Sequence, residues 1–380
     1  MKIVSWQSVL TDHQSHTLRA LQELVQEPVL IVSGVKELKE RQAQGWTAPD
    51  ASGLHVHYLP SSGWWRDGVS ILRENSDAIH LFNGLWADRR FFFLLLEAQR
   101  RGIKTGLVTE PYSDVATGYL NEEFAVKSHV KVILRPWLYR LAGFLVAKRL
   151  CAVFAISEKA VQQFLKIGVK KERMFPFGYF VPPMKNDRRE PPKQARGLRL
   201  VFIGSLIKIK GIQTLVEAIK ACHEQGVDVS LDVYGPGDES MLAGTVGVRY
   251  RGVIPFGEAQ RVIAGYDLLV LPSLYDGWGV VVNEALLQGV PVLVSDQVGA
   301  KTLVKKSGAG AVVTAGDAVA LAAYLKEISL HADRLWVWKD AAAAFRGYLT
   351  PEVAAHYMYD SVRYAVQETN KKPDNPWYTT

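Results

Sequence analysis

The stretch from residue 268 to residue 294 constrains the fold more than any other part of this 380-residue chain. It opens with the apolar run 268–271, which is typical of a strand buried on both faces of a parallel sheet. The residues up to Gln288 are predicted to form a helix that ends at Gly289, because glycine is common just beyond a helix. Residues 290–294 then begin a second apolar strand. This order of strand, loop, helix and strand predicts an α/β domain with a parallel sheet.

The loop inside this stretch is framed by two carboxylates, Asp276 before the helix and Glu284 within it. Gly277 and Gly279 permit backbone angles that other residues resist, so a ligand can approach the chain closely. The N-terminus of a helix adds unpaired N–H groups and a partial positive charge, which suit an anionic or polyhydroxylated ligand. The loop therefore predicts a binding site, and the alternative is an ordinary connection with two surface acids.

The complete string resembles the signature of the retaining glycosyltransferases of family 4, also called glycosyl transferases group 1. The family motif reads Glu-Gly-Phe-Gly, four residues, Glu-Ala and then Gly-x-Pro-Val, and the chain differs from it at Asp276 and Trp278. Members have the GT-B fold, so the resemblance implies an α/β protein with two Rossmann-like doubly wound domains that face a central cleft. It also implies that Asp276 contacts hydroxyl groups of the donor sugar and that Glu284 holds the nucleotide ribose. The loop backbone is implied to touch the sugar at Gly277, Trp278, Gly279 and Val280.

The composition fits two globular domains, since a domain usually spans about 100–200 residues. Hydrophobic residues make up 48% of the chain and charged residues 22%, which is ordinary for a globular protein. No apolar run is long enough for a transmembrane helix. The apolar run at the N-terminus is also shorter than the apolar part of a signal peptide. Cys151 and Cys222 are too few for a disulfide framework or a metal cluster. We therefore expect a cytoplasmic protein without a metal site.

The net charge of +7 predicts an anionic partner. The sequence has no compact run of Lys and Arg and no nucleic-acid-binding module, so nucleic acid is not the expected one. Basic residues do gather in residues 127–149, where they alternate with apolar and aromatic residues and no acid occurs. Such a stretch can lie on a membrane surface. The alternative is a core helix with a solvated basic face, and the sequence leaves both open.

Alternating strand-like and helix-like segments predict a first α/β domain over residues 1–190 and a second over residues 195–346. The resemblance implies that the first domain binds the acceptor and the second binds the nucleotide-sugar donor. In GT-B proteins the chain ends by crossing back, so the predicted helix at residues 351–368 is assigned to the first domain. Residues 369–380 are expected to form a loose tail, although aromatic side chains near its end offer anchors.

Several polar residues of the first domain follow predicted strands at their carboxyl ends, where ligands collect in open parallel sheets. These cleft candidates are Asp12, His13, Asn83, Glu110 and Tyr112. Many family members carry a histidine that approaches the donor sugar where Glu110 stands, so that role does not carry over. For His13 a surface or capping role is the alternative, and it is favoured over a catalytic one.

The expected diphosphate site of the second domain is Lys210, just before a predicted helix. The segment resembles the family's Gly-Arg-Leu-x-x-x-Lys-Gly, in which the Arg and the Lys both bind the donor diphosphate. Gly204 and Lys210 match this pattern, Ser205 replaces the Arg, and Lys208 is the candidate to supply the missing charge. By resemblance to family loops that border the donor, the remaining substrate-binding candidates are Gly235, Ile254 and Gly299.

Together these features predict an enzyme that moves a hexose-type sugar from a UDP- or GDP-linked donor, with retention, to a glycan or a lipid-linked glycan. Asp276, Lys210 and Glu284 are its expected catalytic residues, with no metal and no cofactor. The expected setting is cell-surface polysaccharide or glycoconjugate biosynthesis at the inner face of the plasma membrane, with a polyprenyl-diphosphate-linked acceptor. The alternatives are a non-catalytic partner subunit that kept the fold, and a nucleotide-sugar epimerase or a phosphorylase of the same fold.

Overall fold

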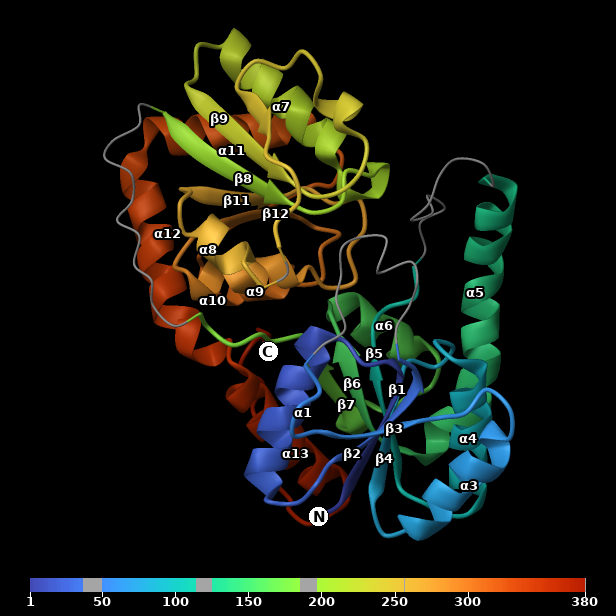
Figure 1. Cartoon of the computed structure of the whole chain (residues 1–380). Coiled ribbons are helices and arrows are strands. Elements are labelled where there is room, and N and C mark those ends of the chain that lie inside the picture. The colour runs from blue at the N-terminus through green and yellow to red at the C-terminus, as the bar shows by residue number, and fades with distance from the viewer. Residues whose placement is uncertain (37–49, 114–124, 185–196, 256, 380) are drawn as a thin grey trace.

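The structure is a computed structural model that describes residues 1–36, 50–113, 125–184, 197–255 and 257–379. It has two α/β domains, and Figure 1 shows the second domain above the first. The polypeptide passes from the first domain to the second between Met184 and Gly197, and it returns through the C-terminal helices.

The first domain is built on a seven-stranded parallel sheet with the order β3-β2-β1-β4-β5-β6-β7. Its strands are β1 (Ile3–Val9), β2 (Leu30–Val35), β3 (His55–Tyr58), β4 (Ile79–Asn83), β5 (Thr105–Thr109), β6 (Leu150–Ile156) and β7 (Met174–Phe177). Its helices are α1 (Asp12–Val25), α3 (Trp64–Glu74), α4 (Arg89–Arg100), α5 (Ala125–Val146) and α6 (Glu158–Lys166). Strands β5 and β6 are buried along almost their whole length because helices cover both faces of the sheet.

The second domain has a six-stranded parallel sheet with the order β10-β9-β8-β11-β12-β13. Its strands are β8 (Leu198–Ile203), β9 (Val229–Tyr234), β10 (Val248–Tyr250), β11 (Leu268–Leu271), β12 (Val292–Ser295) and β13 (Gly310–Val313). Its helices are α7 (Ile212–Glu224), α8 (Ala259–Ile263), α9 (Val280–Leu287), α10 (Lys301–Ser307), α11 (Ala318–Leu330) and α12 (Ala332–Phe345). Strand β11, helix α9 and strand β12 are the unit that the apolar pattern of residues 268–294 predicted.

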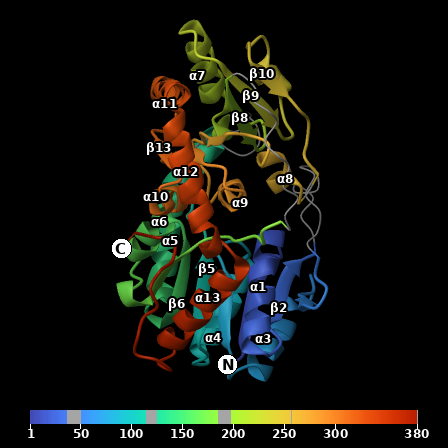
Figure 2. The same ribbon diagram turned by 90° about the vertical axis from the view of Figure 1, so that its left-hand side faces the viewer.

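The C-terminal part of the chain returns to the first domain. After α12 the chain passes through a short helix, η6 (Arg346–Tyr348), into α13 (Pro351–Ala365), which packs against α1. Figures 1 and 2 both show α13 beside α1. The start of α13 follows from its sequence, because the Thr350 side chain accepts a hydrogen bond from the Val353 N–H and Pro351 occupies the first turn.

The tail after α13 is held in place, so the expectation that residues 369–380 are loose is wrong for the part described, up to residue 379. Trp377 is fully buried and packs on Phe177 of β7 and on Phe180. Tyr378 is also buried, and its hydroxyl donates to the carbonyl oxygen of Phe177 over 2.7 Å. The carbonyl oxygen of Trp377 accepts a hydrogen bond from the Thr302 hydroxyl of α10 over 2.9 Å. The tail therefore contacts both domains.

Candidate functional site

The two charged residues predicted to contact the donor lie next to each other. Lys210 ends the short helix η4 (Lys208–Lys210), and Asp276 lies in the loop between β11 and α9. The Lys210 Nζ donates a hydrogen bond to Asp276 Oδ2 over 2.7 Å, and the two side chains are 17% and 13% exposed. Gly211 allows their loops to meet: its φ is 70°, and a Cβ atom there would lie 2.1 Å from the Pro272 carbonyl oxygen.

Two glycines that were predicted as substrate-binding residues, Gly235 and Gly299, are also required by contacts between loops. A Cβ atom at Gly235 would lie 2.0 Å from the carbonyl oxygen of Gly204, and one at Gly299 would lie 2.2 Å from that of Gly277. Such distances exclude any side chain. The loops after β8, β9, β11 and β12 are therefore fixed against one another at the carboxyl edge of the sheet, and their packing alone explains these glycines.

Trp278 was predicted to touch the sugar through its backbone, and its side chain is buried. It is only 2% exposed and packs so closely on Gly178 that a Cβ atom there would lie 2.3 Å from the indole ring. Its indole N–H donates to the Oδ1 atom of Asn283 over 2.9 Å, because a buried tryptophan needs a partner for this group. Only the backbone of Trp278 remains a candidate for contact with a ligand, and the side chain connects the loop to the segment after β7.

Glu284 lies on α9, five positions along from the Asp276–Gly279 loop, and is partly buried. Burial and, to a smaller extent, the negative charge of Asp12 together raise the pKa of its carboxyl to about 7. Asp12 begins α1 of the first domain, where it also contacts the His16 ring nitrogen over 3.1 Å. The two domains thus bring two predicted site residues, Glu284 and Asp12, close enough for their charges to interact.

A second contact between the domains joins Glu110 to the loop between β11 and α9. Glu110 follows β5, and its carboxylate lies so close to Gly277 that a Cβ atom there would be 2.5 Å from Glu110 Oε2. The Tyr179 hydroxyl donates to Glu110 Oε1 over 2.7 Å. The ring of His13 lies 4.2 Å from that of Tyr179, and its Nε2 is 3.1 Å from the Thr11 hydroxyl. Glu110, His13 and Tyr179 therefore form one cluster against the donor-side loop.

Tyr179 was missed by the sequence reasoning. It follows strand β7 at its carboxyl end, so the rule that selected Glu110 after β5 could also have selected Tyr179. The signal was weak because apolar residues surround it and its hydroxyl is its only polar atom in the side chain.

The remaining candidates are less closely associated with this cluster. Asn83 donates from its amide to the Gln7 side chain within the first sheet. The Tyr112 ring packs on Tyr139 of α5 at 4.6 Å between centroids, and its backbone bonds to Gln163. In the second domain, Ser205 lies in the loop after β8, and Lys208 begins the short helix η4 that ends at Lys210. Ile254 is half-buried in the loop after β10.

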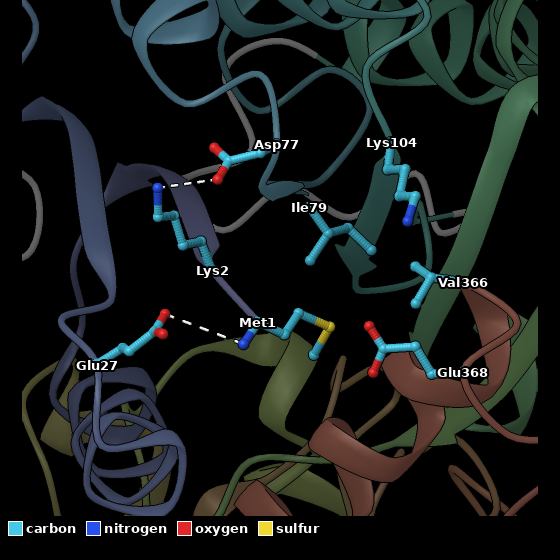
Figure 3. A pocket seen from close by; sticks show the side chains of 8 residues that line it. All are labelled: Met1, Lys2, Glu27, Asp77, Ile79, Lys104, Val366 and Glu368. Carbon is cyan, nitrogen blue, oxygen red and sulfur yellow. Dashed lines mark ion pairs between the residues drawn. The ribbon is translucent and has the colours of Figure 1, made fainter.

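The structure also has a cavity of about 250 Å³ at the opposite end of the first sheet, shown in Figure 3. Six of its eight lining residues precede or begin strands, and the other two, Val366 and Glu368, follow α13. Ion pairs join Lys2 to Asp77 and the amino group of Met1 to Glu27. Ligands of open parallel sheets bind at the carboxyl ends of strands, so this cavity is not the candidate site.

A metal centre is not apparent in the part of the chain that the structure describes, since no group of three or more His, Cys, Asp and Glu residues there could hold an ion.

Comparison with known proteins agrees with this geometry. Residues 197–330, most of the second domain, match the family described as glycosyl transferases group 1. The amylovoran biosynthesis glycosyltransferase AmsK of Erwinia amylovora is 30% identical over 146 residues, which are 35% of this chain and 36% of AmsK. The phosphatidyl-myo-inositol mannosyltransferase of Mycobacterium leprae is 25% identical over 200 residues, half of each chain. The matches thus span half or less of the length of these curated relatives.

A solved structure of Anabaena HepE in complex with UDP-glucose superimposes on 95% of this chain and 99% of its own, with a TM-score of 0.69 and 15% sequence identity. This similarity extends over both domains and confirms the GT-B fold. The second domain carries the sequence match to glycosyl transferases group 1, which confirms the resemblance that the residues around Asp276 predicted.

Proposed function

We propose that this protein is a retaining glycosyltransferase that moves a hexose-type sugar from a UDP- or GDP-linked donor to a glycan or lipid-linked glycan. The observation that carries the proposal is the convergence of Lys210, Asp276 and Glu284 on the donor side with Glu110 and Asp12 from the other domain. The names of the relatives, which are glycosyltransferases of polysaccharide and glycoconjugate assembly, support it.

On the donor side, Lys210 is assigned to the diphosphate. An ammonium group neutralises the charge that develops on a departing diphosphate, and such charge-assisted hydrogen bonds are about twice as strong as neutral ones. The N-terminus of α9 adds unpaired backbone N–H groups at the same loop, since Gly279 with φ 90° precedes the helix. Glu284, farther along α9, is assigned to the ribose. Its ionised carboxylate can accept hydrogen bonds from the two ribose hydroxyls.

The sugar is assigned to the space beside Asp276 and the backbone of Gly277. Asp276 accepts hydrogen bonds from sugar hydroxyls, and Glu110 reaches the same loop from the first domain. The acceptor hydroxyl enters from the first-domain side. With retention of configuration, the leaving phosphate itself takes the acceptor proton, so no separate base residue is assigned. Contact between the domains at Glu110 and Gly277 excludes water from the reacting centre.

The acceptor is assigned to the class of polyprenyl-diphosphate-linked glycans, met at the inner face of the plasma membrane through peripheral contact of residues 127–149. The excess of positive charge in this stretch supports an anionic, membrane-carried acceptor. In the part of the chain that the structure describes, no helix is both long and apolar enough to span a membrane.

The test is calorimetric binding of UDP, GDP, ADP and their hexose conjugates to the wild type and to Glu284→Ala. We expect one nucleotide to bind selectively and the variant to lose that binding. Glu217→Ala removes an exposed acid of α7 in the same domain and should bind as the wild type does. Product analysis with and without an acceptor then separates transfer from epimerisation. Absence of binding to every nucleotide, in a folded protein, would overturn the proposal.

A further inference from the structure

The outer face of helix α5 is apolar and exposed to solvent. We define this outer face as Leu134, Trp137, Leu138, Leu141, Phe144 and Leu145. The exposed fractions reach 77% for Phe144, 65% for Trp137 and 61% for Leu141. These residues recur every three or four positions and therefore form one stripe along the helix. The alternative of a core helix with a solvated basic face is wrong, because it is the apolar face that is solvated. Figure 1 shows α5 at the edge of the molecule.

The opposite face of α5 is fixed on the first domain, so the outer face cannot turn inward. Gly143 packs so tightly on the end of α6 that a Cβ atom there would lie 2.6 Å from the Ile167 carbonyl oxygen. Arg135 Nη1 donates to the Ser113 carbonyl oxygen over 3.0 Å. Burial raises the pKa of Tyr139 on this face to about 12. These contacts hold the segment that follows Glu110 at the candidate cleft.

The charged side chains of α5 and of the three residues after it, in the part whose side chains the structure describes (residues 133–149), are all positive. Arg140 lies beside the outer face, with its guanidinium 5.4 Å from the centre of the Trp137 ring, and Lys148 and Arg149 follow directly after the helix. Residues 127–149 contain no acid. Helices that lie in the interface of an anionic bilayer have this composition: an apolar face of tryptophan, phenylalanine and leucine, with basic side chains beside it. A second copy of this chain is a poorer occupant, since pairing the same face would bring like charges together.

We propose that α5 docks the protein on an anionic phospholipid surface, with its outer face inserted among the lipids and Arg140, Lys148 and Arg149 at the headgroups. The helix lies along the surface, because its other face is packed on the protein. Docking in this orientation brings the segment beside Glu110 to the bilayer, where a lipid-linked acceptor would be met. This last consequence rests on the proposed function, whereas the docking itself does not.

The experiment is co-sedimentation of the full-length protein with vesicles of phosphatidylcholine, alone or mixed with phosphatidylglycerol. We expect binding to the mixed vesicles that weakens with added salt. The double variant Leu141→Ser/Phe144→Ser should lose about tenfold or more in partition coefficient, since two inserted side chains are removed. Arg140→Gln should lose about fivefold on the mixed vesicles, the effect of one basic residue at an anionic surface.

The matched control is Trp336→Ser on α12, because Trp336 is 66% exposed but lies outside α5. It should bind the mixed vesicles as the wild type does. The inference is overturned if the wild type ignores mixed vesicles at low salt, or if the control loses as much binding as the α5 variant. It is also overturned if the wild type is a dimer that Leu141→Ser/Phe144→Ser dissociates, since a second copy then covers the face. Glu284→Ala should keep vesicle binding while losing nucleotide binding, so the two proposals can fail separately.

Discussion

Lys210 and Asp276 form a direct ion pair, with 2.7 Å between Nζ and Oδ2, at the place where the diphosphate and the sugar of the donor are proposed to meet. Each residue therefore neutralises the other before the donor arrives. A bound diphosphate has to share the Lys210 ammonium with Asp276 or displace it, because the ammonium has three donor hydrogens and one of them is already directed at the carboxylate.

Replacing Asp276 should separate binding from catalysis. In Asp276→Asn the carboxylate no longer competes for Lys210, so we expect UDP to bind about threefold tighter or more, the scale of one weakened charge-assisted hydrogen bond. Transfer should fall about 100-fold, because one of the groups that stabilise the sugar in the transition state is lost. Calorimetry with UDP and a transfer assay measure the two effects. Asp276→Glu is the matched variant and should keep most of the transfer activity. Weaker UDP binding by Asp276→Asn would refute this account of the pair.

Lys210→Ala should weaken nucleoside diphosphate binding about 10- to 100-fold, the value of a hydrogen bond to a charged group. The binding of uridine, which lacks phosphate, should not change. Lys208→Ala is the matched control in the same short helix, and because Lys208 is exposed we expect a loss of about threefold or less. Calorimetric titration of both variants with UDP and uridine decides the matter. Equal losses in the two variants would show that Lys208 shares the diphosphate.

The raised pKa of Glu284 predicts a pH-dependent cost to stability. Burial raises this pKa to about 7 in the folded chain, whereas the pKa of glutamate in an unfolded chain is about 4.3. Between about pH 4.5 and 7 the folded state therefore binds more protons than the unfolded state, and stability falls as the pH rises through this window. Glu284→Gln removes the effect.

We expect Glu284→Gln to be more stable than the wild type by about 1–3 kcal/mol near pH 8, with a gain that shrinks towards pH 5. Urea unfolding followed by tryptophan fluorescence at the two pH values measures the difference. The same gain at both values would mean that the effect does not come from ionisation of this carboxyl.

Trp278→Phe should destabilise the protein even though phenylalanine is the residue of the family motif. The shorter ring loses the hydrogen bond to Asn283 and leaves a buried amide oxygen without its donor, at a cost of about 1–3 kcal/mol. The double variant Trp278→Phe/Asn283→Leu should recover part of this loss, because the unsatisfied polar group is then removed too. Thermal unfolding measures both. Trp336→Phe at an exposed position is the control and should change stability by about 0.5 kcal/mol or less.

The sequence predicted the parts of this molecule that depend on neighbours along the chain. The apolar run before Asp276 and the helix after it follow from local pattern, and so does the position of Lys210 ahead of α7. The pairing of Lys210 with Asp276 was not predicted as a contact, but both residues were assigned to the same ligand. Their proximity follows from two adjacent parallel strands, β8 and β11, whose carboxyl ends lie at one edge of the sheet.

The features that the sequence did not reveal depend on contacts between residues far apart in the chain. Trp278 occupies a motif position whose backbone faces the donor in the family. Its ring is buried because Gly178, directly after β7 of the first domain, has no side chain and leaves room for it. The burial of Trp377 depends on Phe177 and Phe180 in the same way. The local sequence does not reveal such contacts, because a loop has no periodic pattern that would distinguish a buried tryptophan from an exposed one. In α5 the local pattern is clear but the burial is not what it indicates. Its apolar residues recur with the spacing of a core helix, yet no described element covers that face.

The described end of the chain also completes the first sheet. β7 is an edge strand, and Pro176 within it is tolerated because one side of an edge strand needs no N–H partner. Two side chains of the tail occupy carbonyl groups of this edge, since Lys372 donates to Met174 and Asn375 to Pro176. Tyr378 donates to the carbonyl of Phe177 at the end of the strand, which also accepts from the Ser157 N–H. An uncovered edge is a template for pairing with a strand of another molecule. The tail thus serves as a side-chain substitute for an eighth strand, and a chain shortened before Lys372 would leave the carbonyls of Met174 and Pro176 without these partners, at an edge through which sheets of separate molecules could join.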